Sequence, residues 1–176
     1  MTLTEAIPTR TLEPAVALSP ARLLGVVRGL ASDLRPWRSL VRHTPAERWF
    51  LRLDAQDEFD TWLIGWDSHQ GVDLHDHGGS AGAFYVVEGE LLETSTRAGG
   101  TDEYDDQRIA AGTARAFGPG HVHRVVNPSA AVATSVHVYS PPLVSMDFYE
   151  AAGPGPLQRT HREPALGTRS GRGELR

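Results

Sequence analysis

Two residue types are missing from this sequence of 176 residues, which contains neither cysteine nor lysine. Without cysteine, the chain can have no disulfide, no thiolate metal ligand and no cysteine nucleophile. Without lysine, Schiff-base chemistry and the phosphate-loop lysine are excluded. All 17 basic residues are arginines. Composition alone therefore removes several common mechanisms.

Long apolar runs and an excess of positive charge are also missing. No stretch approaches the ~20 apolar residues that span a bilayer, and the N-terminus lacks the basic start and apolar core of a signal peptide. The formal net charge of -5 argues against nucleic acid as the main partner, because phosphate binding needs clustered positive charge. We therefore expect a cytoplasmic protein without a membrane or nucleic-acid partner.

The chain length predicts one domain with loosely packed ends. The chain can form one well-cored domain but is too short for two ordinary ones. Residues 1–18 lack periodicity and are expected to be a loosely ordered leader. Residues 19–150 are expected to form the domain. Residues 151–176 are rich in Gly, Pro and Arg, so we expect a flexible tail that buries no face. We expect a monomer.

The residue pattern changes from helical to strand-like near Arg48. Ser19 suits a helix cap, Pro20 suits the first helical position, and apolar residues recur at helical spacing as far as Leu34. Beyond Arg48, short β-rich runs such as "FDTWLIGW" and "VATSVHVYS" alternate with Gly, Asp, Asn and Pro turns. Short strands without helices between them predict an all-β sandwich or barrel, with the helix packed outside.

Two histidines lie one residue apart in "LHDHGGSAGAFYVVEGEL", residues 74–91. In a strand, residues i and i+2 point to the same face, so His75 and His77 would direct both rings to one side of the sheet. This spacing suits two ligands of one metal ion. Histidines also occur on surfaces and in satisfied cores, so the pair alone leaves both interpretations open.

The residues around this pair resemble the two sequence motifs of the cupin superfamily. The residues in register are Gly71, His75, His77 and Gly89 in the first motif and Gly120, His123 and Asn127 in the second. The resemblance implies a cupin double-stranded β-helix, a jelly-roll-like barrel with an N-terminal helix or two packed outside. It also implies that His123 is the third metal ligand, although His121 shares its face and is a rival.

Gly82 stands where a cupin usually has its glutamate. Three histidines without that carboxylate resemble the cysteine dioxygenase type I family, the thiol dioxygenases of the cupin superfamily, in its bacterial form. The resemblance runs from about Arg48 to Pro142 and includes "HDHGGSAGAF", "HRVVN" and "SVHVYSPP". In the animal enzymes a cysteine at the position of Gly82 is crosslinked to the tyrosine that matches Tyr139. Because this chain has no cysteine, that crosslink cannot form.

The resemblance implies a mononuclear non-haem Fe(II) site and a role in cysteine catabolism. The implied reaction inserts both atoms of O2 into a small thiol, converting L-cysteine to cysteine sulfinic acid. Three neutral imidazoles leave an Fe(II) site with a charge of about +2 and open coordination positions. Such a site favours an anionic chelating substrate, and a thiolate supplies that charge.

Further side chains receive roles from the same resemblance. Ser135, His137 and Tyr139 alternate on one predicted strand and share a face, which the family uses as a hydrogen-bonded relay. Tyr139 would lie near O2 and the substrate carboxylate, with His137 orienting it and Ser135 behind. The alternative is a half-buried strand whose polar groups are satisfied. We predict that Arg48 binds the substrate carboxylate through its planar guanidinium, and Arg52 is the alternative.

Other functions stay open at this point. A near neighbour is a dioxygenase for 3-mercaptopropionate, which has no amine. Three histidines also form catalytic zinc sites, although no general base is evident. A cupin that binds a metal or ligand without catalysis is the non-enzymatic alternative. The remaining histidines, His43, His69 and His161, are expected at the surface, and Trp62 and Trp66 are expected in the core.

Overall fold

The computed structural model describes residues 17–97, 104–151 and 156–165. These residues form one α-helix, α1 (Pro20–Ser32), one short 3-10 helix, η1 (Arg38–Leu40), and eleven β-strands. The strands are β1 (Trp49–Ala55), β2 (Asp60–Trp66), β3 (Gly71–His75), β4 (Ala81–Glu88), β5 (Glu90–Arg97), β6 (Asp105–Ala110), β7 (Ala114–Phe117), β8 (His121–Val126), β9 (Ala133–Ser140), β10 (Ser145–Glu150) and β11 (Gln158–Pro164). None of the described helices has the length and apolar composition that crossing a membrane requires.

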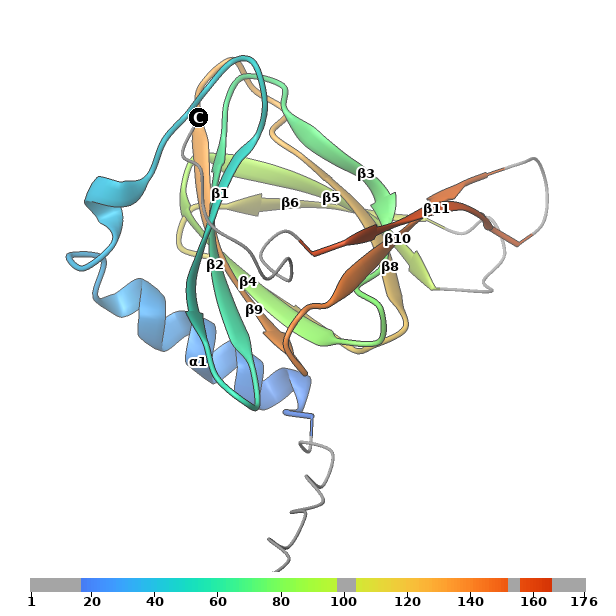
Figure 1. The fold of residues 1–176 in the computed structure, drawn as a ribbon. Helices are drawn as coiled ribbons and strands as arrows, with labels where there is room; N and C mark the ends of the chain where they lie inside the picture. Colours follow the sequence, from blue (N-terminus) through green and yellow to red (C-terminus); the bar gives the residue numbers. More distant parts are fainter. Residues whose placement is uncertain (1–16, 98–103, 152–155, 166–176) are drawn as a thin grey trace, which may run out of the picture.

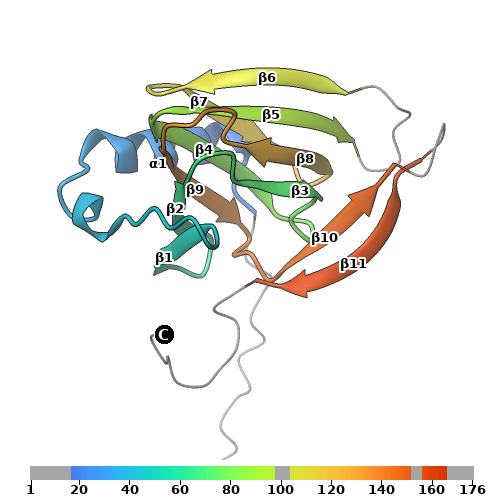
Figure 2. The same ribbon diagram turned by 90° about the horizontal axis from the view of Figure 1, so that it is seen from above.

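The strands form two antiparallel sheets that face each other as a barrel (Figure 1). The five-stranded sheet has the order β1-β2-β9-β4-β7, and the six-stranded sheet has the order β11-β10-β3-β8-β5-β6. Seen from above, the β10–β11 hairpin extends the six-stranded sheet beyond the body of the barrel (Figure 2). The prediction of an all-β jelly-roll-like barrel is confirmed.

Helix α1 packs on the outer face of the five-stranded sheet, as the sequence predicted. The Ser19 side chain caps it by accepting a hydrogen bond from the Arg22 backbone nitrogen at 3.4 Å, and Pro20 occupies the first turn. Leu23 and Val27 are fully buried against β4 and β9. Burying one such side chain contributes roughly 1.5–3 kcal/mol, so this face holds the helix on the sheet.

The central strand β2 is buried on both faces, which explains its unbroken apolar run. Trp62, Ile64 and Trp66 point into the barrel and pack with core residues of both sheets. Leu63, at the opposite parity, belongs to the cluster beneath the helix. A strand with two covered faces needs apolar residues at both parities. The placement of Trp62 and Trp66 in the core agrees with the expectation for both.

Residues 158–164 of the expected tail form β11, in which every residue is exposed. This strand pairs antiparallel with β10. Its arginines have a partner, because Asp147 of β10 accepts hydrogen bonds from Arg162 at 2.6 Å and Arg159 at 3.2 Å. Composition suggested a solvated tail, whereas the free edge of β10 gives the segment a strand to pair with. The other tail residues, 152–155 and 166–176, lie outside the described residues.

The predicted leader lies almost wholly outside the described residues, because the structure describes the chain only from residue 17. Leu18 is buried, and its backbone nitrogen donates a hydrogen bond to Ser140 Oγ at 2.8 Å.

The expectation of a surface position is wrong for His43. Its partly buried ring lies 3.1 Å from both the Ala133 carbonyl oxygen and Thr134 Oγ1.

Candidate metal centre

Three buried histidines converge inside the barrel. His75 ends β3 and pairs directly with His123 of β8, and His77 follows two residues later. The ring centroids are 4.7 Å apart for His75 and His123 and 5.0 Å apart for the two other pairs. One ligand nitrogen from each ring lies within 4.8 Å of the other two. This spacing would let one metal ion contact all three.

His77 reaches the cluster from a turn and not from a strand. Strand β3 ends at His75, so His75 and His77 do not alternate along one strand as predicted. Gly78 and Gly79 both have positive φ, 59° and 94°, which glycine adopts without strain. The Asp76 carboxylate accepts a hydrogen bond from the Gly78 nitrogen at 2.9 Å. The turn therefore places the His77 ring in the same cluster as His75, which is where alternation along a strand had predicted it.

The hydrogen bonds of the three rings leave nitrogens free for a metal. His75 Nδ1 lies 2.7 Å from the Asp73 carbonyl oxygen, and His123 Nδ1 lies 2.7 Å from Glu93 Oε1. His77 stacks between Phe117 and Tyr139, and neither of its buried nitrogens has a hydrogen-bond partner. A buried polar atom without a partner costs about 1–3 kcal/mol. A metal ion would give one of the two His77 nitrogens a partner, so these residues fit a metal site.

All three rings are held in the form that binds metals. Burial lowers the pKa values of His75 and His77 well below their usual range, and the neighbouring imidazoles lower them further. Burial also lowers the pKa of His123, although Glu93 opposes this effect. Neutral imidazole is the ligand form of histidine, so binding at neutral pH displaces no proton from these rings.

Glu93 is a residue of the candidate site that the sequence analysis missed. It is buried in β5, and Oε1 accepts from His123 Nδ1 at 2.7 Å and from His121 Nε2 at 3.0 Å, while Oε2 lies 3.0 Å from Arg115 Nε. Burial would raise the Glu93 pKa, but these partners hold it well below its usual range. Glu93 lies two residues after the buried Leu91 in β5, so both side chains point into the barrel. This spacing was the sequence signal that could have identified Glu93.

The rival ligand His121 lies beside Glu93, not at the three-histidine cluster. Glu93, His121 and His123 are themselves close enough to hold an ion. However, both carboxylate oxygens of Glu93 already accept hydrogen bonds from charged or histidine side chains. A carboxylate that holds the Nδ1–H of a histidine orients that ring and strengthens it as a ligand. We therefore interpret this group as support for His123.

Ser135, His137 and Tyr139 form a hydrogen-bonded row along β9, and all three are buried. Ser135 Oγ lies 2.8 Å from His137 Nε2, and the Tyr139 hydroxyl lies 3.2 Å from His137 Nδ1. Burial lowers the His137 pKa to about 3 and raises the Tyr139 pKa, so both side chains are neutral at pH 7. Trp66 Nε1 donates to Ser135 Oγ at 2.9 Å, which adds a fourth member that sequence reasoning did not identify.

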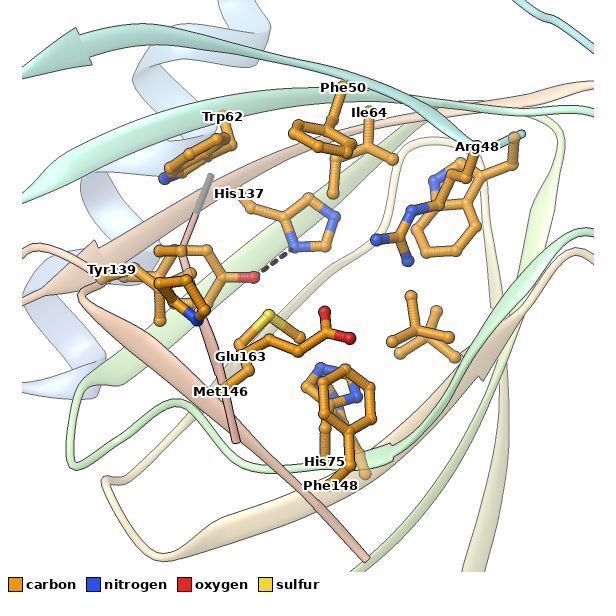
Figure 3. Close-up of a pocket in the computed structure, with 17 residues that line it drawn as sticks. Arg48, Phe50, Trp62, Ile64, His75, His137, Tyr139, Met146, Phe148 and Glu163 are labelled. Carbon is orange, nitrogen blue, oxygen red and sulfur yellow. Dashed lines mark hydrogen bonds between the residues drawn. The ribbon is translucent and has the colours of Figure 1, made fainter. Parts of the chain in front are cut away.

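Of the two candidate arginines, Arg48 lies in the pocket and Arg52 does not. Arg48 lines it together with His75, His137 and Tyr139 (Figure 3). Its Nε and one terminal nitrogen are buried and have no hydrogen-bond partner among the described residues. Burial lowers the Arg48 pKa to about 10, which leaves the side chain cationic at pH 7. Arg52 instead forms an ion pair with Asp60 at 3.1 Å.

The pocket is small and mostly apolar. Its volume is about 110 Å³, well below the roughly 300–1,000 Å³ of clefts for drug-sized ligands. Aromatic and aliphatic side chains from both sheets form most of its wall, and His75 and His123 contribute their rings to it. A small molecule that enters would therefore lie between the histidines, the Tyr139 hydroxyl and the unpartnered Arg48.

The two facing sheets and the buried histidines define the chain as a cupin. A structure from Thermus thermophilus matches 60% of this chain and 93% of its own, with 25% identity and a TM-score of 0.51. A cupin superfamily protein from Desulfitobacterium hafniense matches 60% and 87%, with 11% identity and a TM-score of 0.49. The sequence model of the cysteine dioxygenase type I family matches residues 21–152, and the chain belongs to that family.

Proposed function

We propose that the protein is a mononuclear non-haem iron thiol dioxygenase that converts L-cysteine and O2 to cysteine sulfinic acid. The reaction is balanced, because the thiol and one O2 give one sulfinic acid, with both oxygen atoms on sulfur. The observation that carries the proposal is a neutral three-histidine cluster of which two members, His75 and His123, share one small pocket with the buried guanidinium of Arg48. Membership of the cysteine dioxygenase type I family supports it.

Iron(II) would be held by His75, His77 and His123, and it would supply the positive charge that favours a thiolate and a redox-active centre for O2 chemistry, while the thiol sulfur is the group that is oxidised. The protein contributes three neutral ligands and a largely apolar wall. Glu93 fixes the ring of His123 from behind through its 2.7 Å hydrogen bond. With no carboxylate among the three ligands, the site retains charge for an anionic substrate.

Arg48 is proposed to bind the substrate carboxylate. Its buried Nε and terminal nitrogen lack partners, and a guanidinium can donate two parallel hydrogen bonds to one carboxylate. Because this cation lies in the same pocket as His75 and His123, a bound carboxylate would hold the thiol end of a small substrate near the histidines. Such positioning lowers the entropic cost of the reaction.

Tyr139 is proposed to act as a hydrogen-bond donor toward the reacting atoms. Burial raises its pKa, so the phenol keeps its proton at neutral pH. The Trp66 donor occupies Ser135 Oγ, which lets the Ser135 hydroxyl donate to His137 Nε2. His137 Nδ1–H then donates to the Tyr139 oxygen. This order leaves the Tyr139 hydrogen free to point into the pocket.

The test is an anaerobically prepared, iron-loaded protein exposed to L-cysteine and O2. We expect O2 uptake matched by an equal yield of cysteine sulfinic acid. A protein that consumes no O2 with any small thiol would overturn the proposal. Zinc-loaded protein is the matched control, because zinc is redox-inactive. Activity that survives with zinc under anaerobic conditions would instead indicate hydrolytic chemistry.

A further inference from the structure

The β10–β11 hairpin contributes an acidic side chain to the pocket. Glu163, near the end of β11, is one of the lining residues, as are Met146 and Phe148 of β10. Figure 3 shows the Glu163 carboxylate directed into the pocket, between the Arg48 guanidinium and the His75 ring. The side chain is 60% exposed, which places it at the mouth of the pocket.

Arg48 and Glu163 are the two charged residues in the pocket lining. The remaining lining residues are apolar, neutral histidines, or the protonated Tyr139. Among the described residues, no ion pair joins Arg48 to Glu163, and Nε and one terminal nitrogen of Arg48 have no hydrogen-bond partner. Glu163 Oε1 lies 3.5 Å from His161 Nε2, which is an ion-pair distance when that ring is protonated. Burial lowers the Arg48 pKa, and the Glu163 charge partly opposes this shift. Both side chains therefore keep hydrogen-bonding capacity for a bound molecule.

We propose that Glu163 selects thiols that carry an amine beside their carboxylate, by accepting a hydrogen bond from that amine while Arg48 binds the carboxylate. This inference rests on the proposed function, because it concerns the substrate of the same pocket. An amino thiol acid such as cysteine has an amine N–H donor as well as a carboxylate, so it matches the two sides of the pocket. A thiol acid without an amine leaves Glu163 beside an anion, and like charges disfavour binding.

The alternative role for Glu163 is to balance the charge of Arg48 and hold the hairpin. That role predicts the same change for every substrate, because it acts on the protein alone. Selection predicts a change only for substrates with an amine. Comparing two thiols that differ in the amine therefore separates the two roles, and 3-mercaptopropionate is cysteine without its amine.

The experiment measures kcat/KM for L-cysteine and for 3-mercaptopropionate in the wild type, Glu163→Gln and Glu150→Gln, at equal iron content. Glutamine keeps the shape of the side chain and removes its charge. Glu150 is an exposed acidic residue of the same hairpin that does not line the pocket, so it serves as the matched control. Unfolding temperatures of the three proteins verify that the hairpin is intact.

We expect Glu163→Gln to lower kcat/KM for L-cysteine by about three- to tenfold, because glutamine still accepts a hydrogen bond but lacks the charge that strengthens it in a partly screened site. The value for 3-mercaptopropionate should stay unchanged or rise, and Glu150→Gln should change neither. Added salt should reduce the preference of the wild type for cysteine, because the mouth is exposed. Equal losses for both thiols, or no loss for cysteine, would overturn the inference.

Anaerobic binding separates this inference from the proposed function. The dissociation constants of L-cysteine and 3-mercaptopropionate, measured by calorimetry with iron-loaded protein without O2, require no turnover. If the wild type consumes no O2 with either thiol, the proposed function fails. Glu163 is then judged by whether Glu163→Gln weakens the binding of L-cysteine alone. A variant that binds both thiols as the wild type does would sink the inference even in an active enzyme.

Discussion

The two sheets support their functional side chains in different ways. On the six-stranded sheet, His123 is backed by Glu93, a buried carboxylate whose pKa is lowered by hydrogen bonds from His121 and His123 and, less strongly, by the charge of Arg115. On the five-stranded sheet, Tyr139 is backed by His137 and then by a neutral chain of side chains. An anionic partner strengthens a metal ligand, whereas a neutral partner orients a hydroxyl without taking its proton. The charge of each supporting side chain thus matches the role proposed for His123 and for Tyr139.

Removing a proposed metal ligand from the six-stranded sheet should have the largest effect on iron content and activity. His123→Ala should lose its iron and its activity, because two histidines remain. The iron content of purified protein measures this directly. His121→Ala is the matched control, since His121 contacts the same oxygen of Glu93 from the outer side, and this variant should retain most of its iron. Complete loss of iron from both variants would favour Glu93, His121 and His123 as the ligands.

Removing only the negative charge behind the ligand should have the next largest effect. Glu93→Gln should weaken iron binding by about 10–100-fold, the usual cost of losing a partner behind a metal ligand. Competition with a chelator under anaerobic conditions gives the affinity without any turnover. Glu90→Gln is the control, because Glu90 lies on the same strand and pairs with Arg108 at the surface. Equal affinities for Glu93→Gln and the wild type would mean that the carboxylate does not support the ligand.

Substitutions in the neutral row of side chains on the five-stranded sheet should show the opposite pattern. Iron binding should be retained and turnover should be impaired. Tyr139→Phe should bind iron like the wild type and lower kcat by about tenfold or more, since it removes the hydroxyl donor. The ratio of sulfinic acid formed to O2 consumed should also fall. Ser135→Ala should cause a smaller loss, because it acts only through His137. Unchanged kinetics for Tyr139→Phe would contradict the relay.

The smallest effect concerns the hairpin that forms the mouth of the pocket. Hydrogen bonds from Arg162 and Arg159 lower the Asp147 pKa to about 2. The pKa is depressed in the folded state, so the stabilisation is present above the unfolded pKa near 3.9 and is lost as the pH falls toward 2. The two arginines are exposed, so the contribution is within about 1 kcal/mol. Asp147→Asn should speed hydrogen exchange in β11 at pH 7, and this difference from the wild type should shrink below pH 4.

The sequence predicted best the parts of the fold that local patterns control. Ser19 and Pro20 marked the start of α1, and "GHVHRVVN" placed His123 in a strand beside the cluster. Strand β11 was missed because its pairing depends on the edge of β10 and on Asp147, which no local pattern reveals. Glu93 was missed for a related reason, since its partners come from strands 22 to 30 residues away.

Gly82 lies where a side chain would collide with the pocket wall. A Cβ at this position would stand 2.5 Å from Cε2 of Phe117 and 3.1 Å from Cδ1 of Tyr139. The Phe117 ring fills the space that a crosslinking partner of Tyr139 would need. Because the sequence contains no cysteine, Tyr139 cannot form a thioether crosslink. The activity that we propose should therefore show no lag phase caused by formation of that crosslink.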